Sequence, residues 1–130
     1  MKTLITILAF FLASSAPGFA QQTKTKYKAV PVEKADKLME KKKPIVLDVR
    51  TPEEVAAGTI PGSLNYNFNA PEFKQQLSTL DKSQPYLVYC RSGNRSGKAI
   101  EIMKEMGFRR LYEMKAGFPA YAEYKKKSVE

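Results

Sequence analysis

One stretch decides the fold of this chain: Tyr86-Leu87-Val88-Tyr89-Cys90-Arg91-Ser92-Gly93-Asn94-Arg95-Ser96-Gly97. Its first five residues are apolar or aromatic without alternation, which is typical of a strand buried on both faces of a parallel sheet. Beyond it, Gly107 is suited to end a helix whose apolar face has helical spacing, at Ala99, Ile102, Met103 and Met106. The stretch therefore predicts a strand, a polar loop and a helix, with the chain's only cysteine at the first junction.

The polar loop predicts a binding site for an anion. Backbone N–H groups in such a loop can turn inward, and the amino end of the helix adds partial positive charge. Gly93 permits a tight curve, and Arg91 and Arg95 add two cations. We therefore expect a thiolate at Cys90, with a pKa below the ordinary cysteine value. The alternative interpretation, a small buried hydrophobic cysteine, does not explain the loop's composition.

Outward from this stretch, strand-like and helix-like segments alternate. The sequence predicts strands over Tyr27–Val30, Ile45–Val49, Ser63–Phe68 and Leu111–Met114, and helices around Ala35–Met39, Phe73–Leu80 and Phe118–Ala122. A short helix begins with Thr51 as N-cap, Pro52 at the first position and Glu54 as capping-box partner, and Gly58 ends it. This alternation predicts an α/β domain with parallel strands and right-handed crossovers.

Several side chains are expected near the cysteine because the carboxyl ends of parallel strands meet at one edge. Asp48 and Arg50 end the strand that follows Pro44, and Glu54 follows them closely. Two interpretations stay open: these three residues contact the substrate or support its loop, or they form a structural ion-pair and capping cluster. Phe118 and Tyr121 form either a pocket wall or core packing.

The N-terminus has the pattern of a secretory signal. Lys2 precedes an apolar run over 4–13, and small residues precede a cleavage site after Ala20. We expect a cleaved signal peptide over 1–20, a disordered segment over 21–26 and a domain over 27–127, in the periplasm or secreted. The alternative is an uncleaved anchor, but the run is shorter than the roughly 20 residues a spanning helix needs. We expect no stable membrane insertion after cleavage.

Composition excludes several kinds of site. One cysteine cannot close an internal disulfide, and the absence of histidine removes Cys–His and Ser–His pairs and most zinc sites. No metal or organic cofactor is implied. The 22 Lys and Arg outnumber the 13 Asp and Glu, with runs at 41–43 and 125–127 that indicate a solvated basic surface at helix ends or attraction of anions. Nucleic acid is not expected as a partner.

The segment Cys90–Ser96 resembles the active-site loop of single-domain rhodaneses, the thiosulfate:cyanide sulfurtransferases. The resemblance extends to Leu47–Glu54, Gly58–Asn65 and Met114–Tyr121. It implies a three-layer fold with a five-stranded parallel sheet flanked by helices and the cysteine strand at its centre. Three positions depart from the usual pattern, because Thr59 replaces a histidine, Ala116 a glycine and Tyr121 a tryptophan.

The resemblance also implies an activity. Cys90 takes a sulfane sulfur from a small anionic donor such as thiosulfate, holds it as a persulfide, and passes it to cyanide, a thiol or a protein acceptor. The loop residues Arg91, Ser92, Gly93, Asn94, Arg95 and Ser96 bind the substrate. The loop from Cys90 to Arg95 has six residues, whereas the resemblance implies a seven-residue loop for the related dual-specificity phosphatases. The shorter loop disfavours phosphatase activity. The alternatives are a non-enzymatic persulfide carrier or sensor acting with an exported partner and, less well supported, a purely structural domain.

Overall fold

The computed structural model describes residues 24–130. It contains five strands: β1 (Lys26–Ala29), β2 (Ile45–Asp48), β3 (Leu64–Asn65), β4 (Pro85–Tyr89) and β5 (Arg110–Glu113). They form one sheet in the order β1-β5-β4-β2-β3, and every neighbouring pair is parallel. β4 therefore lies at the centre, and the predicted five-stranded parallel sheet is confirmed.

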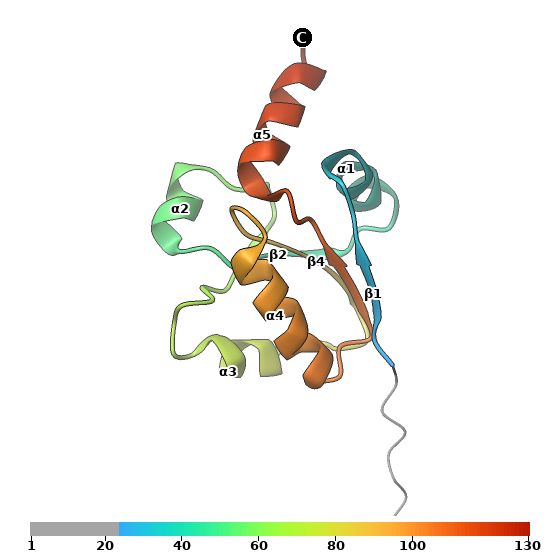
Figure 1. Ribbon diagram of the computed structural model, residues 1–130, viewed down its shortest axis with the longest axis vertical. Helices are drawn as coiled ribbons and strands as arrows, with labels where there is room; N and C mark the ends of the chain where they lie inside the picture. Colours follow the sequence, from blue (N-terminus) through green and yellow to red (C-terminus); the bar gives the residue numbers. More distant parts are fainter. Residues whose placement is uncertain (1–23) are drawn as a thin grey trace, which may run out of the picture.

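Five helices flank the sheet: α1 (Val32–Lys41), α2 (Pro52–Ala57), α3 (Phe73–Ser78), α4 (Asn94–Glu105) and α5 (Gly117–Ser128). Figure 1 shows α1 and α5 on one side of the sheet and α3 and α4 on the other. Each side has its own apolar core, one centred on α3 and α4 and the other on α1 and α5. This arrangement confirms the three layers. Within residues 24–130 no helix combines the length and the apolar character needed to cross a membrane.

Because side chains alternate along β4 and Cys90, this segment contributes side chains to both cores. Tyr86, Val88 and Cys90 pack toward α3 and α4, whereas Leu87 and Tyr89 pack toward α1 and α5. All five side chains are at most 1% exposed. A strand buried on both faces requires an unbroken apolar run, so the burial predicted from the sequence is confirmed.

The predicted capping box at the start of α2 is confirmed. Thr51 Oγ1 accepts a hydrogen bond from the Glu54 backbone N–H, and the Glu54 carboxylate accepts one from the Thr51 N–H at 2.9 Å. Pro52 occupies the first helical position, and Gly58 ends the helix. This short helix is thus fixed at a defined place beside the end of β2.

Several boundaries differ from the sequence-based predictions, most of them by one residue. β3 is only two residues long instead of spanning Ser63–Phe68, although the Tyr66 and Phe68 N–H groups still donate to the carbonyls of Asp48 and Val49. α4 begins at Asn94 rather than near Ser96, because Gly93 adopts a left-handed φ of 91° and turns the chain directly into the helix. Lys26, which the predicted disordered segment 21–26 includes, belongs to β1 and pairs with Arg110. The predicted signal peptide and residues 21–23 lie outside the described residues.

Candidate active site

Cys90 is the first residue after β4 and is 1% exposed. The Gly93 backbone N–H donates a hydrogen bond to its Sγ at 3.1 Å, and Ser96 Oγ lies 3.5 Å from the sulfur. Burial raises the pKa of the Cys90 thiol, but hydrogen bonds to the thiolate from the Ser96 hydroxyl and from loop N–H groups outweigh it and bring the pKa below its ordinary value. The loop therefore places hydrogen-bonding groups around the Cys90 sulfur, as a site for a thiolate requires.

The remaining residues of the predicted loop divide into a rim and a base. Arg91, Ser92 and Asn94 are exposed, whereas Ser96 is completely buried beneath them. Arg91 follows Cys90 directly and forms no ion pair within residues 24–130. The exposed part of the loop thus carries one cation without an ion pair among these residues and two polar side chains.

Arg95 forms an ion pair that the sequence did not predict. Its guanidinium forms two hydrogen bonds with the Glu54 carboxylate, at 2.7 and 2.9 Å. Arg95 lies in the first turn of α4 and Glu54 in the first turn of α2, so the pair ties the loop to the neighbouring helix. The hydrogen bond from Arg95 lowers the pKa of Glu54 to about 2, assisted by Thr51 and opposed by partial burial.

The Glu54–Arg95 pair predicts an acid-dependent loss of stability. Because the pKa of Glu54 falls from 4.5 to about 2 on folding, the pair's contribution is fully present above pH 4.5 and disappears as the pH falls toward 2. Glu54→Gln retains the capping-box geometry but loses the charge. We expect the free energy of unfolding of this variant in urea at pH 7 to be about 1 to 2 kcal/mol lower than that of the wild type. This range allows for solvent screening of the partly exposed pair.

Urea unfolding at neutral pH and at about pH 2.5 checks this prediction, since the difference between the two proteins should shrink at the acidic pH. A difference that is the same at both pH values would show that the charge of Glu54 does not stabilise the fold.

Asp48 and Arg50 form a buried ion pair at 2.7 Å, with side chains 0% and 5% exposed. Burial raises the pKa of Asp48, but hydrogen bonds from Arg50 and Tyr89 outweigh it and hold the pKa below its usual range. Thr59 Oγ1 also donates to Asp48, so the residue that replaces the family's histidine is satisfied here. These contacts match the structural-cluster interpretation of Asp48, Arg50 and Glu54.

The start of α5 packs against the loop backbone to backbone. The Phe118 N–H donates to the Cys90 carbonyl at 2.9 Å, and Gly117 has a φ of 80°. A Cβ atom on Gly117 would lie 1.9 Å from the Arg91 carbonyl oxygen, and one on Gly93 would lie 2.9 Å from the Lys115 carbonyl oxygen. Both glycines are therefore required by close approach as well as by backbone conformation. Figure 1 shows this loop directly beside the start of α5.

Phe118 and Tyr121 match the core-packing interpretation, and the hollow that they line includes no residue of the Cys90 loop. The Phe118 ring stacks on Tyr89 and lies 4.3 Å from the Arg50 guanidinium carbon, while Tyr121 is only 8% exposed in the α1–α5 core. Both also line a hollow between α1 and α5. They hold the base of α5, and through it the loop around Cys90.

Sequence reasoning missed Glu113, the last residue of β5. Its carboxylate is 1% exposed and accepts hydrogen bonds from Ser96 Oγ at 2.8 Å and from Tyr27 Oη at 2.7 Å. Ser96 in turn contacts Cys90 Sγ, so Glu113 is connected to Cys90 through one hydroxyl. The available signal was a charged residue inside the predicted buried strand Leu111–Met114.

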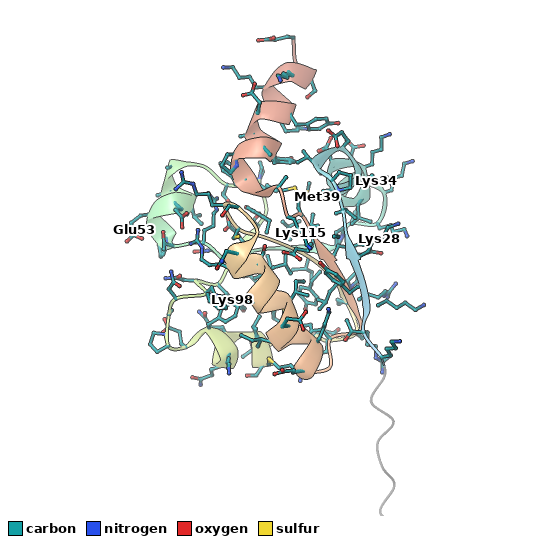
Figure 2. The ribbon with its side chains drawn as sticks, in the orientation of Figure 1. Lys28, Lys34, Met39, Glu53, Lys98 and Lys115 are labelled. Carbon is teal, nitrogen blue, oxygen red and sulfur yellow. The ribbon has the colours of Figure 1, made fainter. Side chains whose placement is uncertain are left out.

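Other features lie outside this site. Lysines gather around a hollow beside β1 and α1, formed by Lys28, Lys34, Lys37, Lys41 and Lys42, and Figure 2 shows Lys28 and Lys34 on that side of the molecule. Lys41 and Lys125–Lys127 occupy the last turns of α1 and α5, as predicted. In the part of the chain that the structure describes, no group of three or more His, Cys, Asp and Glu side chains is placed to hold a metal ion.

Comparison with known proteins identifies relatives over most of the domain. The model of the Rhodanese-like domain family matches residues 31–124. The thiosulfate sulfurtransferase GlpE of Pseudomonas putida is 33% identical over 95 residues, which cover 72% of this chain and 84% of that protein. A rhodanese-related protein from Thermoplasma volcanium has a similar structure, with a TM-score of 0.67 and 28% identity, over 75% of this chain and 93% of its own.

A further relative is much longer than this chain. The tRNA uridine(34) hydroxylase of Pelagibacter ubique is 36% identical over 95 residues, but the chain spans only 32% of that protein's length. The similarity therefore concerns one part of a larger protein.

Proposed function

The chain belongs to the family of rhodanese-like domains, and from that premise we propose that it moves a sulfane sulfur from thiosulfate or a related donor to a thiol or cyanide through a persulfide on Cys90. The observation that carries this proposal is the position of Cys90 Sγ, 3.1 Å from the Gly93 N–H at the amino end of α4. A sulfur held there as an anion is a nucleophile.

In the first half-reaction, the Cys90 thiolate attacks the outer sulfur of the donor. A sulfur–sulfur bond forms to Cys90, the sulfur–sulfur bond within thiosulfate breaks, and sulfite leaves with the electron pair. The loop N–H groups that stabilise the thiolate also stabilise the terminal charge of the resulting persulfide. Their fixed orientation supplies this stabilisation without reorganisation during the reaction.

In the second half-reaction, the acceptor attacks the outer sulfur of the persulfide and the Cys90 thiolate is the leaving group. The depressed pKa of Cys90 assists this step as well, because a more stable thiolate leaves more readily. Arg91 is the cation best placed to attract the anionic donor, since it is exposed and unpaired within residues 24–130, while Arg95 shares its charge with Glu54.

Steady-state kinetics test this proposal. Two half-reactions joined by a covalent intermediate predict parallel lines in double-reciprocal plots of thiocyanate formation against thiosulfate at several cyanide concentrations. Intersecting lines would require both substrates to bind together and would contradict the persulfide route. The purified domain, residues 24–130, is a suitable sample because these residues form the complete sheet and both cores.

One observation favours a second candidate, a persulfide carrier for a protein acceptor. Cys90 is only 1% exposed, which protects a bound sulfur from solvent and from small thiols. A carrier accepts one sulfur per chain and releases it slowly to cyanide. Rapid multiple turnover with cyanide would eliminate this candidate, whereas a single burst of thiocyanate equal to the protein concentration would support it.

A further inference from the structure

Glu113 is a buried carboxylate for which the sulfur-transfer steps above have no use. It ends β5, directly beside β4, where it pairs in register with Val88. Its two oxygens receive one hydrogen bond each, from the hydroxyls of Tyr27 and Ser96. None of the ion pairs formed within residues 24–130 includes it. A fully buried carboxylate without a cation is costly to keep ionised, so we expect Glu113 to have a functional role.

The titratable groups around Glu113 come from three elements. Tyr27 faces it from β1, Ser96 from α4, and Cys90 lies beyond Ser96 at the end of β4. Lys104 lies beside Tyr27, with its Nζ 4.2 Å from the centre of the tyrosine ring, and it pairs with Glu101. Its charge is therefore shared with a carboxylate other than Glu113.

Ser96 has one hydroxyl hydrogen and two anions that can accept it. When Glu113 is ionised, the Ser96 hydroxyl donates to Oε2 at 2.8 Å, and the Cys90 S–H donates to Ser96 Oγ across 3.5 Å. When Cys90 is ionised, the same hydroxyl stabilises the thiolate, and a protonated Glu113 can donate to Ser96 Oγ. The three groups therefore have two consistent hydrogen-bond arrangements, related by the shift of two protons, one from Cys90 to Ser96 and one from Ser96 to Glu113.

We propose that Glu113 accepts the proton of Cys90 through the Ser96 hydroxyl and so makes the thiolate inside the closed site. The Cys90 S–H bond breaks as its proton joins Ser96 Oγ, and the proton that Ser96 held joins Glu113 Oε2. No electron is transferred and no other reactant is needed. Glu113 touches neither the sulfur nor the substrate, so it is a positioning residue for the proton.

The surroundings of the two anion sites support this direction of transfer. The thiolate gains the Gly93 N–H and the amino end of α4, neither of which contacts the carboxylate. Burial raises the pKa of Tyr27, and its hydrogen bond to Glu113 raises it further, so Tyr27 stays a donor throughout. Since Cys90 is 1% exposed, an internal acceptor also removes the need for a water molecule to reach the thiol.

A shared proton has a signature in the rate of cysteine alkylation. Between the two titration steps of a coupled pair, the total number of bound protons is constant, so the fraction of thiolate does not depend on pH. In the wild-type protein we therefore expect a plateau, at least about one pH unit wide, over which the iodoacetamide rate changes less than about threefold. In Glu113→Gln, Cys90 titrates alone, so the rate should fall about tenfold per pH unit below a single midpoint.

Glu105→Gln is the matched control, because Glu105 lies on α4, is exposed, and loses the same charge in the same substitution. It should keep the wild-type plateau. Wild-type and Glu113→Gln profiles that superimpose as single steps would overturn the proposal. The assay uses no sulfur donor, so although the proposal rests on Cys90 as the nucleophile of the proposed function, each can fail separately.

Tyr27→Phe provides a second, independent test if Glu113→Gln does not fold. Removing the Tyr27 hydroxyl withdraws one donor from the ionised carboxylate and favours the proton on Glu113. The plateau alkylation rate should therefore rise, by up to about tenfold. A merely structural role for this tyrosine predicts an unchanged or lower rate, and either result would contradict the relay.

Discussion

Replacing Cys90 with serine is expected to lower the turnover of thiosulfate and cyanide at least about 1,000-fold. The serine hydroxyl does not ionise near neutral pH and cannot form a persulfide, while the loop N–H groups remain in place to hold an oxygen of similar size. The fold should therefore be unaffected, because the hydrogen bonds from Phe118 and Gly93 to this residue can persist. Thiocyanate formation measures the loss, and thermal unfolding of the same sample provides the control.

Residual turnover above about a tenth of the wild-type rate, in a folded Cys90→Ser protein, would contradict this expectation. It would mean that the reaction needs only the anion-binding loop, since the sequence contains no second cysteine.

Gly117→Ala should have the largest effect on the fold. Its Cβ would lie 1.9 Å from the Arg91 carbonyl oxygen and 2.9 Å from that of Cys90, and the φ of 80° is unfavourable for alanine. Both neighbours are backbone, so the loop and the start of α5 must separate. We expect a loss of about 2 to 4 kcal/mol in the free energy of unfolding, measured in urea, together with loss of sulfur transfer.

Gly97→Ala is the control for Gly117→Ala. Gly97 lies inside α4, and a Cβ atom at this position would lie 3.7 Å from Glu113 Oε2, an ordinary contact. Alanine should therefore stabilise the helix by about 0.5 to 1 kcal/mol. Equal stabilities of the two alanine variants would show that the loop and α5 are not in tight backbone contact.

The features that the sequence predicted are those with local causes. The uninterrupted apolar run of β4, the capping box of Thr51 and Glu54, and the turn at Gly93 each depend on residues close together in the chain. Hydrophobic periodicity and turn chemistry report such causes directly. The order of strands and helices follows from them, whereas the central position of the Cys90 strand was implied by the family resemblance.

The features that the sequence did not predict depend on distant partners. Arg95 reaches Glu54 across 41 positions, and Tyr27 reaches Glu113 across 86. Neither pairing has a local sequence signature, because each depends on which elements lie next to one another in the folded domain. The ion pair of Arg95 with Glu54 and the buried carboxylate near Cys90 were consequently overlooked.

The most direct test of the account is the intact mass of the protein after incubation with thiosulfate and removal of excess donor. We predict that the wild-type chain gains one sulfur atom, that peptide mapping places it on Cys90, and that cyanide then removes it with release of one thiocyanate per chain. Cys90→Ser should gain nothing under the same conditions. A wild-type protein that turns over thiosulfate and cyanide without ever carrying the additional sulfur would contradict the persulfide on Cys90.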